Sequence, residues 1–340
     1  MTIISPIGKL YGRVMDLRNL LYDRDILKSH ELGARTISVG NLTTGGTGKT
    51  PLVALIAKIL IDEGETACIL TRGYGRKDPE KHVLVSDGTN ILTDAATGGD
   101  EPVELAQWLG GQAIIVADRD RVAAAKWARE NFPISTFILD DGFQHRRARR
   151  DLDIVCIDAT DPCGNGRILP AGTLRESLKS IARADVIVIT RTEQVADTKT
   201  LEIRLRNQNA GAAIFRANSQ LGALVSIEEF HEKAQSTRST DSVLLAFTGI
   251  GNPKNFYTSL ERESHNVVAA ESFPDHHRFT QADVYKIESK ARASNAAALV
   301  TTAKDAVKLK GFKFELPCYV AIAETAIDDA EAFKKLIISS

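Results

Sequence analysis

The sequence lacks the features that mark secreted, membrane-spanning or nucleic-acid-binding proteins. Its 340 residues include only four cysteines, with no CxxC pair, so neither a disulfide framework nor a thiolate metal site is indicated. A formal net charge of −1 lacks the basic excess of a dedicated nucleic-acid binder. No apolar run approaches the roughly 18 residues that cross a bilayer, and the start MTIISPIGKL lacks the apolar core of a signal peptide. We therefore expect a protein of the reducing cytosol, without a spanning segment.

The N-terminal segment, residues 1–30, has the pattern of a basic amphipathic helix. Apolar residues recur at three- and four-residue steps, and basic residues lie between them: Ile7, Leu10, Val14, Leu17 and Leu21, with Lys9, Arg13, Arg18 and Arg24. The periodicity does not say what covers the apolar face. Two interpretations therefore stay open, a membrane-surface helix and a helix packed on its own domain.

A glycine-rich turn occurs within SVGNLTTGGTGKTPLV, residues 38–53. Such a loop directs backbone N–H groups toward phosphates, ahead of a helix N-terminus that favours negative charge. The general GxxxxGK[ST] pattern has glycine where this chain has Thr43, but the preceding strand, the following helix and the intact GKT still indicate a phosphate-binding loop. The predicted nucleotide-binding residues are Thr43, Thr44, Gly45, Gly46, Thr47, Gly48, Lys49 and Thr50. Lys49 would reach the β- and γ-phosphates, and the Thr50 hydroxyl would bind Mg²⁺.

Two adjacent aspartates follow a buried apolar run in Phe137-Ile138-Leu139-Asp140-Asp141-Gly142. A carboxylate at the end of such a strand can hold magnesium across from the P-loop hydroxyl. Adjacent aspartates before a glycine also cap turns. In a chain with a P-loop, magnesium binding by Asp140 and Asp141 is the favoured interpretation.

The remaining pattern alternates apolar runs with helical segments, which predicts an α/β fold with a mostly parallel, P-loop NTPase-like sheet covered by helices on both faces. The expected strands lie at 68–70, 113–117, 134–139, 153–157, 186–190, 213–216, 243–248, 297–301 and 318–322, and the expected helices at 51–63, 254–262 and 281–293. We place a boundary near residue 220. Residues 31–220 would form the nucleotide-binding domain, and residues 221–340 a smaller α/β domain.

The phosphate acceptor stays open from these patterns alone. The NKxD motif of a regulatory GTPase is absent, and its nearest imitation, Thr302-Ala303-Lys304-Asp305, has the wrong spacing. The stretch Phe273-Pro274-Asp275-His276-His277-Arg278-Phe279 puts two imidazoles beside a carboxylate. It suits either proton handling or a surface turn before the next helix, and it is too short of ligands to indicate a metal site.

Several motifs together resemble the tetraacyldisaccharide 4'-kinases of lipid A biosynthesis, over nearly the whole chain. They are, in order, VGNLTTGGTGKTP, TRGYGRK, GGDEP, DDGFQHRRARRDLDIV, LPAGTLRE, FTGIGNP, FPDHHRF and TTAKDAVKL. The resemblance implies an ATP- and Mg²⁺-dependent kinase that phosphorylates the 4'-hydroxyl of a lipid-linked disaccharide 1-phosphate. It also implies a peripheral protein at the anionic cytoplasmic face of the bacterial inner membrane. No particular protein partner is indicated, and the alternative function is a P-loop NTPase driving a chaperone or metal-insertion event.

The resemblance further implies roles for individual residues. Asp100 in GGDEP matches the family's catalytic aspartate, and we expect an imidazole of the DHH sequence, His276 rather than His277, to orient it or share its proton, with Lys49 completing the catalytic set. From the residues alone, an N-cap at Asp100 before Val103 to Leu109 stays open.

For Glu176 and for the basic run, the sequence leaves a second interpretation open beside a role in the site. Glu176 would serve the metal or the substrate, or form a loop salt bridge with Arg175. The basic run that contains Arg146 and Arg147 would meet the substrate's 1-phosphate or anionic lipid, or form a solvated face. Tyr74 and Arg76 would contact the active cleft.

Overall fold

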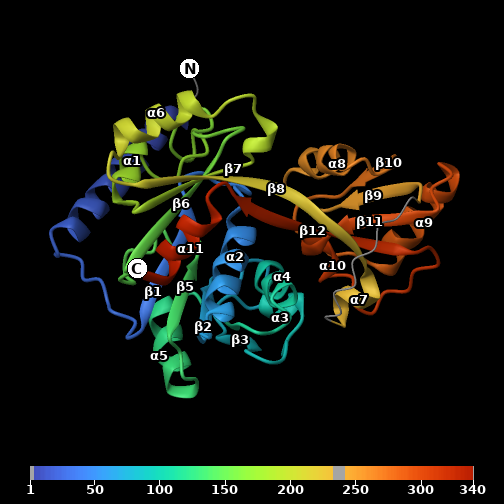
Figure 1. Ribbon diagram of the computed structural model, residues 1–340, viewed down its shortest axis with the longest axis horizontal. Coiled ribbons are helices and arrows are strands. Elements are labelled where there is room, and N and C mark those ends of the chain that lie inside the picture. Colours follow the sequence, from blue (N-terminus) through green and yellow to red (C-terminus); the bar gives the residue numbers. More distant parts are fainter. Residues whose placement is uncertain (1–3, 233–241, 340) are drawn as a thin grey trace. The chain divides into compact units, whose positions relative to one another are not determined.

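The computed structural model describes residues 4–232 and 242–339 and divides into two units (Figure 1). Unit 1 consists of residues 1–72, 118–219 and 325–340, and unit 2 of residues 73–117 and 220–324. Residues 1–3 of the expected N-terminal helix lie outside the described residues. The expected boundary near residue 220 falls at this division, but residues 73–117 lie in unit 2 and the C-terminal residues 325–340 lie in unit 1.

Unit 1 contains the P-loop and a parallel sheet. Its elements are α1 (Ile4–Asp23), β1 (Arg35–Asn41), α2 (Lys49–Asp62), β2 (Ala67–Thr71), α5 (Arg121–Asn131), β5 (Thr136–Asp140), β6 (Leu152–Asp158), η1 (Leu178–Arg183), β7 (Val186–Thr190), η2 (Thr192–Gln194), α6 (Lys199–Gln208), the first part of β8 (Ala213–Ser226) and α11 (Ala330–Ser339). Neighbouring strands follow the order β8-β7-β6-β1-β5-β2, all parallel. Helix α11, from the end of the chain, packs beside α2 (Figure 1).

Unit 2 is a second α/β body. Its elements are β3 (Val83–Asp87), α3 (Ala95–Gly98), α4 (Asp100–Trp108), β4 (Ile114–Ala117), the second part of β8, α7 (Ile227–His231), β9 (Leu244–Thr248), α8 (Pro253–Arg262), β10 (Val267–Ser272), α9 (Gln281–Ala293), β11 (Ala298–Thr302), α10 (Ala303–Ala306) and most of β12 (Cys318–Ile327). Strands β10-β9-β11-β12 are parallel neighbours, whereas β3 and β4 pair antiparallel. The mostly parallel α/β fold is therefore confirmed.

Each unit has its own apolar core, because the buried strands carry near-continuous apolar side chains. In unit 1, Phe143, Val155 and Ile187 belong to one buried cluster. In unit 2, Leu244 and Val300 from neighbouring strands pack with Leu260 from α8. These cores fix the strand ends from which the site residues project.

Helix α1 turns its small residues inward and its apolar residues outward. Gly12 and Asn19 are buried, and a Cβ added at Gly12 would lie 2.8 Å from Cδ1 of Ile168, so the helix approaches this side chain closely. The side chains of the expected stripe are mostly solvent-exposed, at 63% for Leu10, 54% for Val14 and 56% for Leu17. The side chain of Ile7 lies outside the described part. One face of α1 thus packs on the rest of unit 1, and the apolar stripe on the other face stays mostly exposed.

No helix among residues 4–232 and 242–339 combines the length and the apolar character needed to cross a bilayer.

Candidate active site

The P-loop joins the end of β1 to the start of α2. Gly48 is the N-cap of α2 with φ +76°, and Gly45 has φ +115°, conformations that residues with side chains rarely adopt. Side chains from neighbouring strands fix the loop: Asn41 Nδ2 donates to Thr47 Oγ1 at 2.8 Å, and Thr190 Oγ1 donates to the Thr47 carbonyl at 2.9 Å. The loop therefore presents its backbone and the start of α2 as one fixed element, as phosphate binding requires.

Of the two predicted aspartates, Asp140 ends β5 and Asp141 follows it, and β5 is the parallel neighbour of β1. Asp140 is buried and accepts a hydrogen bond from Thr71 Oγ1 at 2.9 Å. Asp141 Oδ1 lies 3.5 Å from the Nζ of Lys49, and its Oδ2 accepts from Arg175 Nη1 at 2.6 Å. Burial raises the pKa of Asp141, but Lys49 and Arg175 outweigh this and hold the pKa below its usual value. The Asp141 carboxylate is thus kept ionised beside the P-loop lysine.

Asp100 and His276 come together in unit 2, although 176 positions separate them in the chain. Nδ1 of His276 lies 3.0 Å from Oδ2 of Asp100, and the side chain of Asp100 is only 8% exposed. This hydrogen bond raises the pKa of His276 above its usual value. His277 points to a different partner, with Nε2 3.2 Å from Asp283, and its ring stacks on Phe273. The expected choice of His276 agrees with this geometry.

The motif around Asp100 is held by glycines in unusual conformations. Gly99, with φ +98°, is the N-cap of α4, and Asp100 is the first helical residue. The N-cap alternative for Asp100 is therefore wrong. A Cβ at Gly99 would lie 2.8 Å from the carbonyl oxygen of Tyr74, so GGDEP packs directly against TRGYGRK. In TRGYGRK, Gly75 at φ +83° lies next to the Asp100 carboxylate.

The whole chain, residues 1–340, matches the family model for tetraacyldisaccharide-1-P 4'-kinase. The chain belongs to this family. A tetraacyldisaccharide 4'-kinase of Halothermothrix orenii is 40% identical over 90% of this chain and 82% of the relative, and one of Desulfotalea psychrophila is 37% identical over 98% and 95%. Among solved structures, LpxK from Aquifex aeolicus in complex with ATP has a TM-score of 0.79 at 33% identity, covering 98% of this chain and 96% of that one. The resemblance based on the motifs is thereby confirmed.

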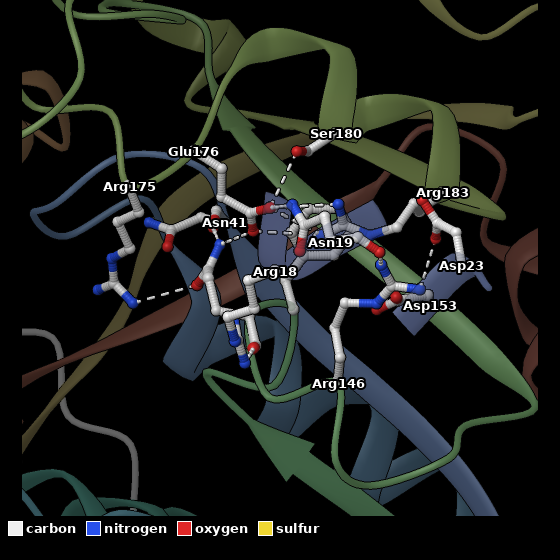
Figure 2. A network of polar contacts seen from close by, with 12 residues as sticks. Arg18, Asn19, Asp23, Asn41, Arg146, Asp153, Arg175, Glu176, Ser180 and Arg183 are labelled. Carbon is white, nitrogen blue, oxygen red and sulfur yellow. Dashed lines mark hydrogen bonds and ion pairs between the residues drawn. The ribbon is translucent and has the colours of Figure 1, made fainter. Parts of the chain in front are cut away.

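In this member of the tetraacyldisaccharide 4'-kinase family, Glu176 lies at the centre of a buried polar network (Figure 2). Its Oε2 accepts from Asn19 Nδ2 at 2.6 Å and Ser180 Oγ at 2.9 Å, and its Oε1 accepts from Gln144 Nε2 at 2.9 Å. The guanidinium of Arg183 donates to both oxygens at 3.1–3.2 Å. The network links α1 to the segment after β5 and to the loop before η1.

The alternative salt bridge between Glu176 and Arg175 is wrong, because Arg175 pairs with Asp141 and Glu176 pairs with Arg183. Burial raises the pKa of Glu176, but Arg183 and the hydrogen-bond donors lower it below its usual value. To bind a metal, the carboxylate would have to give up donors that already occupy both oxygens. We therefore do not propose Glu176 as a magnesium ligand.

The basic run after β5 forms internal ion pairs. Each arginine has a different acidic partner within unit 1: Arg146 with Asp23, Arg147 with Asp120, Arg149 with Glu31 and Arg150 with Asp153. Arg146 also donates to the carbonyl of Asn19 at 2.8 Å and lies over the ring of Tyr22. A substrate phosphate bound by Arg146 or Arg147 would have to compete with these carboxylates.

The two candidate residues in TRGYGRK, Arg76 and Tyr74, differ in how far they are buried. Arg76 is buried, and its guanidinium donates to the backbone carbonyls of Gly73, Lys81, Pro79 and Ala117 at 2.5–3.0 Å. These bonds fold the loop and leave the Arg76 side chain a structural role. Tyr74 is 44% exposed, so its side chain remains accessible to a ligand.

The carboxylates at the end of β5 have the chemistry that magnesium prefers, which is oxygen donors. Oδ1 of Asp141 is buried, lies 3.5 Å from the Nζ of Lys49 and accepts no hydrogen bond from the described residues. No group of three His, Cys, Asp or Glu side chains within the described part of the chain forms a ready metal site. Asp140, Asp141 and the Thr50 hydroxyl therefore fit a metal bound jointly with phosphates and water rather than an all-protein cage.

Three charged residues near Asp100 had no role predicted from the sequence. They are Lys304, Asp305 and Lys308, all within the motif TTAKDAVKL. Lys304 Nζ lies 3.7 Å from Glu101 and 3.5 Å from Asp275, and Lys308 Nζ lies 3.8 Å from Asp100. The only signal in the sequence was the four-residue spacing of the two lysines, which puts them on one side of a helical turn.

Proposed function

We propose that this chain transfers the γ-phosphate of ATP to the 4'-hydroxyl of a tetraacyldisaccharide 1-phosphate, giving the lipid IVA type bisphosphate of lipid A biosynthesis. The observation that carries the proposal is the Asp100–His276 pair in a chain of this kinase family. An alcohol acceptor must lose a proton during phosphoryl transfer, and a carboxylate supported by an imidazole can take it. A P-loop NTPase that drives a chaperone or metal-insertion event would not need this pair.

The nucleotide part of the proposed chemistry belongs to unit 1. The backbone of residues 43–50 would hold the phosphates of ATP, and Lys49 would neutralise charge on the β- and γ-phosphates. Thr50, Asp140 and Asp141 would hold Mg²⁺, which supplies further charge neutralisation when bound. The ion pair between Lys49 and Asp141 keeps the lysine beside the strand end until a nucleotide offers it stronger acceptors.

The proton-accepting part belongs to unit 2. Asp100 would take the proton of the 4'-hydroxyl, while His276 holds its carboxylate through the 3.0 Å hydrogen bond. A typical aspartate has a pKa of about 3.9 and is a weak base, so orientation of the hydroxyl is the larger part of its effect. Tyr74 is our remaining candidate from TRGYGRK for a substrate contact.

We also propose that the protein works at the cytoplasmic face of the inner membrane and binds it peripherally through α1. Leu10, Val14 and Leu17 are all more than half exposed, and Lys9 and Arg13 are exposed beside them. An amphipathic helix of this kind lies in the membrane interface, where its basic residues attract anionic lipid.

Incubation with γ-labelled ATP, Mg²⁺ and a tetraacyldisaccharide 1-phosphate in mixed micelles tests the proposed activity. We expect the label to move to the lipid, and the transfer to stop when Mg²⁺ is chelated. A disaccharide lipid whose 4'-hydroxyl is blocked is the matched control and should receive no label. If the label instead appears as inorganic phosphate at the same rate with and without lipid, the NTPase alternative holds and the kinase proposal fails.

A further inference from the structure

A second aspartate, Asp305, organises the backbone around the Asp100–His276 pair. It is fully buried, and its Oδ2 accepts from Thr248 Oγ1 at 2.6 Å, from the Gly249 N–H at 2.8 Å and from Thr302 Oγ1 at 2.9 Å. Thr248 ends β9 and Thr302 ends β11, so this carboxylate fastens two strand ends together. The Gly249 carbonyl in turn accepts from the backbone N–H of His276 at 3.1 Å. Asp305 therefore fixes the turn that carries the imidazole.

Lys308 lies between this buried carboxylate and Asp100. Its Nζ is 2.7 Å from Oδ1 of Asp305 and 3.8 Å from Oδ2 of Asp100, and its side chain is only 7% exposed. Its ammonium also lies 5.4 Å from the ring centre of Phe279. A lysine buried to this degree is rare unless it is paired, and here its charge is shared by two carboxylates.

His276 and Lys308 act on the same oxygen of Asp100. Both the imidazole Nδ1 and the ammonium Nζ approach Oδ2, at 3.0 and 3.8 Å. The other oxygen, Oδ1, accepts no hydrogen bond from a described side chain, and its near neighbour is Gly75, which has no side chain to cover it. One carboxylate oxygen is thus held by two cationic or hydrogen-bonding groups while the second stays available.

We propose that Lys308 is a positioning residue for proton transfer, which together with His276 fixes Oδ2 of Asp100 and leaves Oδ1 to accept the proton of the acceptor hydroxyl. The inference rests on the proposed role of Asp100. In the step, the O–H bond of the hydroxyl breaks as Oδ1 takes the proton. The hydroxyl oxygen then forms its bond to the γ-phosphorus, and the bond between that phosphorus and the oxygen of ADP breaks.

Carboxyl groups outnumber ammonium groups around Asp100. The titratable groups on α4, on the turn after β10 and around α10 are Glu101, Glu104, Asp275, His276, Lys304, Asp305 and Lys308. Burial raises the pKa of Glu104 to about 8. Without Lys308, Oδ2 of Asp100 would keep its contact with His276 but lose the cation beside it.

Replacing Lys308 with methionine, which keeps the length of the side chain and removes its charge, tests the proposal. We expect kcat for lipid phosphorylation to fall by about 10²-fold, the order of loss that follows small misplacement of a catalytic group. The KM values for ATP and lipid should change little. Lys308→Arg, which keeps the charge, should restore much of the lost kcat, and the exposed Lys310→Met is the matched control with wild-type kinetics.

Removal of Lys308 also leaves Asp305 buried without its cation, so the double variant Lys308→Met/Asp305→Asn separates the two effects. Asparagine can still accept from Gly249 and the threonine hydroxyls. If Lys308 acts on Asp100, the double variant regains thermal stability but keeps the low kcat. If wild-type kcat returns, Lys308 serves only the fold and the proposal is overturned.

The proposal also fails if Lys308→Met keeps the wild-type kcat, or loses only affinity for ATP or lipid, while Asp100→Asn is inactive. Full activity of Asp100→Asn would instead reject the proposed function, whatever Lys308 does.

Discussion

Replacing Glu176 with alanine should destabilise unit 1 strongly. The carboxylate is fully buried, and its removal leaves the guanidinium of Arg183, only 19% exposed as a side chain, without its counter-charge. Breaking a buried ion pair from one side costs about 3–5 kcal/mol, because the remaining charge is uncompensated. The donors of Asn19, Gln144 and Ser180 lose their acceptor as well. For a unit of this size, at about 2–4 °C per kcal/mol, Tm should fall by roughly 6–20 °C.

The destabilisation should depend on pH in a defined direction. Burial raises the pKa of Glu176, but Arg183 and the hydrogen bonds together lower that pKa by more. The pKa of Glu176 in the folded protein therefore lies below its usual value. A carboxyl group whose pKa is lower in the folded protein than in the unfolded chain stabilises the fold. That stability is fully present above the unfolded-chain pKa of about 4.3 and is lost as pH falls through the folded-state pKa. The stability difference between wild type and Glu176→Gln should therefore be constant at neutral pH and shrink in acid.

Thermal unfolding in metal-free buffer, followed by circular dichroism, measures this effect. The exposed Glu130→Ala, on α5, is the matched control and should stay within about 0.5 kcal/mol of wild type. An unchanged Tm for Glu176→Ala, with a loss of activity that high Mg²⁺ reverses, would refute the structural role and make Glu176 a metal ligand.

Three further outcomes follow from the site and from α1. Lys49→Ala should abolish phosphate transfer with little change in Tm, measured with labelled ATP, since it removes charge from the β- and γ-phosphates; near-normal turnover would reject the P-loop assignment. Val14→Glu combined with Leu17→Glu should reduce sedimentation with anionic vesicles at unchanged Tm, because both side chains are over half exposed; equal binding would place the membrane contact elsewhere. Because hydrogen bonding to Asp100 raises the pKa of His276, the stability that His276 adds should be full below pH of about 6.5 and fade as pH rises through the folded pKa. Measuring the Tm of the wild type and of His276→Asn over a range of pH checks this direction. The Tm difference should shrink as pH rises, and a difference that grows with pH would contradict the prediction.

Elements with strong apolar or helical patterns were predictable from the sequence. Strand β7 and helix α9 begin and end at the predicted residues, because each has an unbroken pattern and α9 starts with the capping box of Thr280 and Asp283. Strands β3 and β10 were missed. Strand β10 carries small residues in VVAAES and alternates between half-buried and exposed positions at the edge of its sheet, so its apolar signal is weak.

Long strands were predicted too short for a related reason. Strand β8 runs from Ala213 to Ser226, although only its first four residues were expected, since it continues through polar residues that are partly exposed. The assignment of residues 73–117 to unit 2 was not predictable either, because which body a segment joins depends on contacts between distant parts of the chain.

In the site, local motifs were easier to predict than long-range partners. The P-loop and the aspartates at the end of β5 could be predicted, because strand, turn and helix follow one another there in consecutive residues. The pairing of Asp100 with His276 came only from the family resemblance, since no spacing rule connects them. The partners of Arg146, Arg147 and Glu176 lie on α1, at the N-cap of α5 and on η1. The sequence alone could therefore not distinguish ion pairs within the fold from an anion-binding face.

The joint action of Asp100 and His276 is the central claim, and kcat of the single and double alanine variants tests it most directly. Each single substitution should lower kcat for lipid phosphorylation by about 10²–10⁴-fold at nearly unchanged KM for ATP, because each removes the same proton-accepting unit. The double variant should then be little worse than the poorer single variant. Losses that multiply in the double variant, or an Asp100→Ala protein with wild-type kcat, would contradict the account.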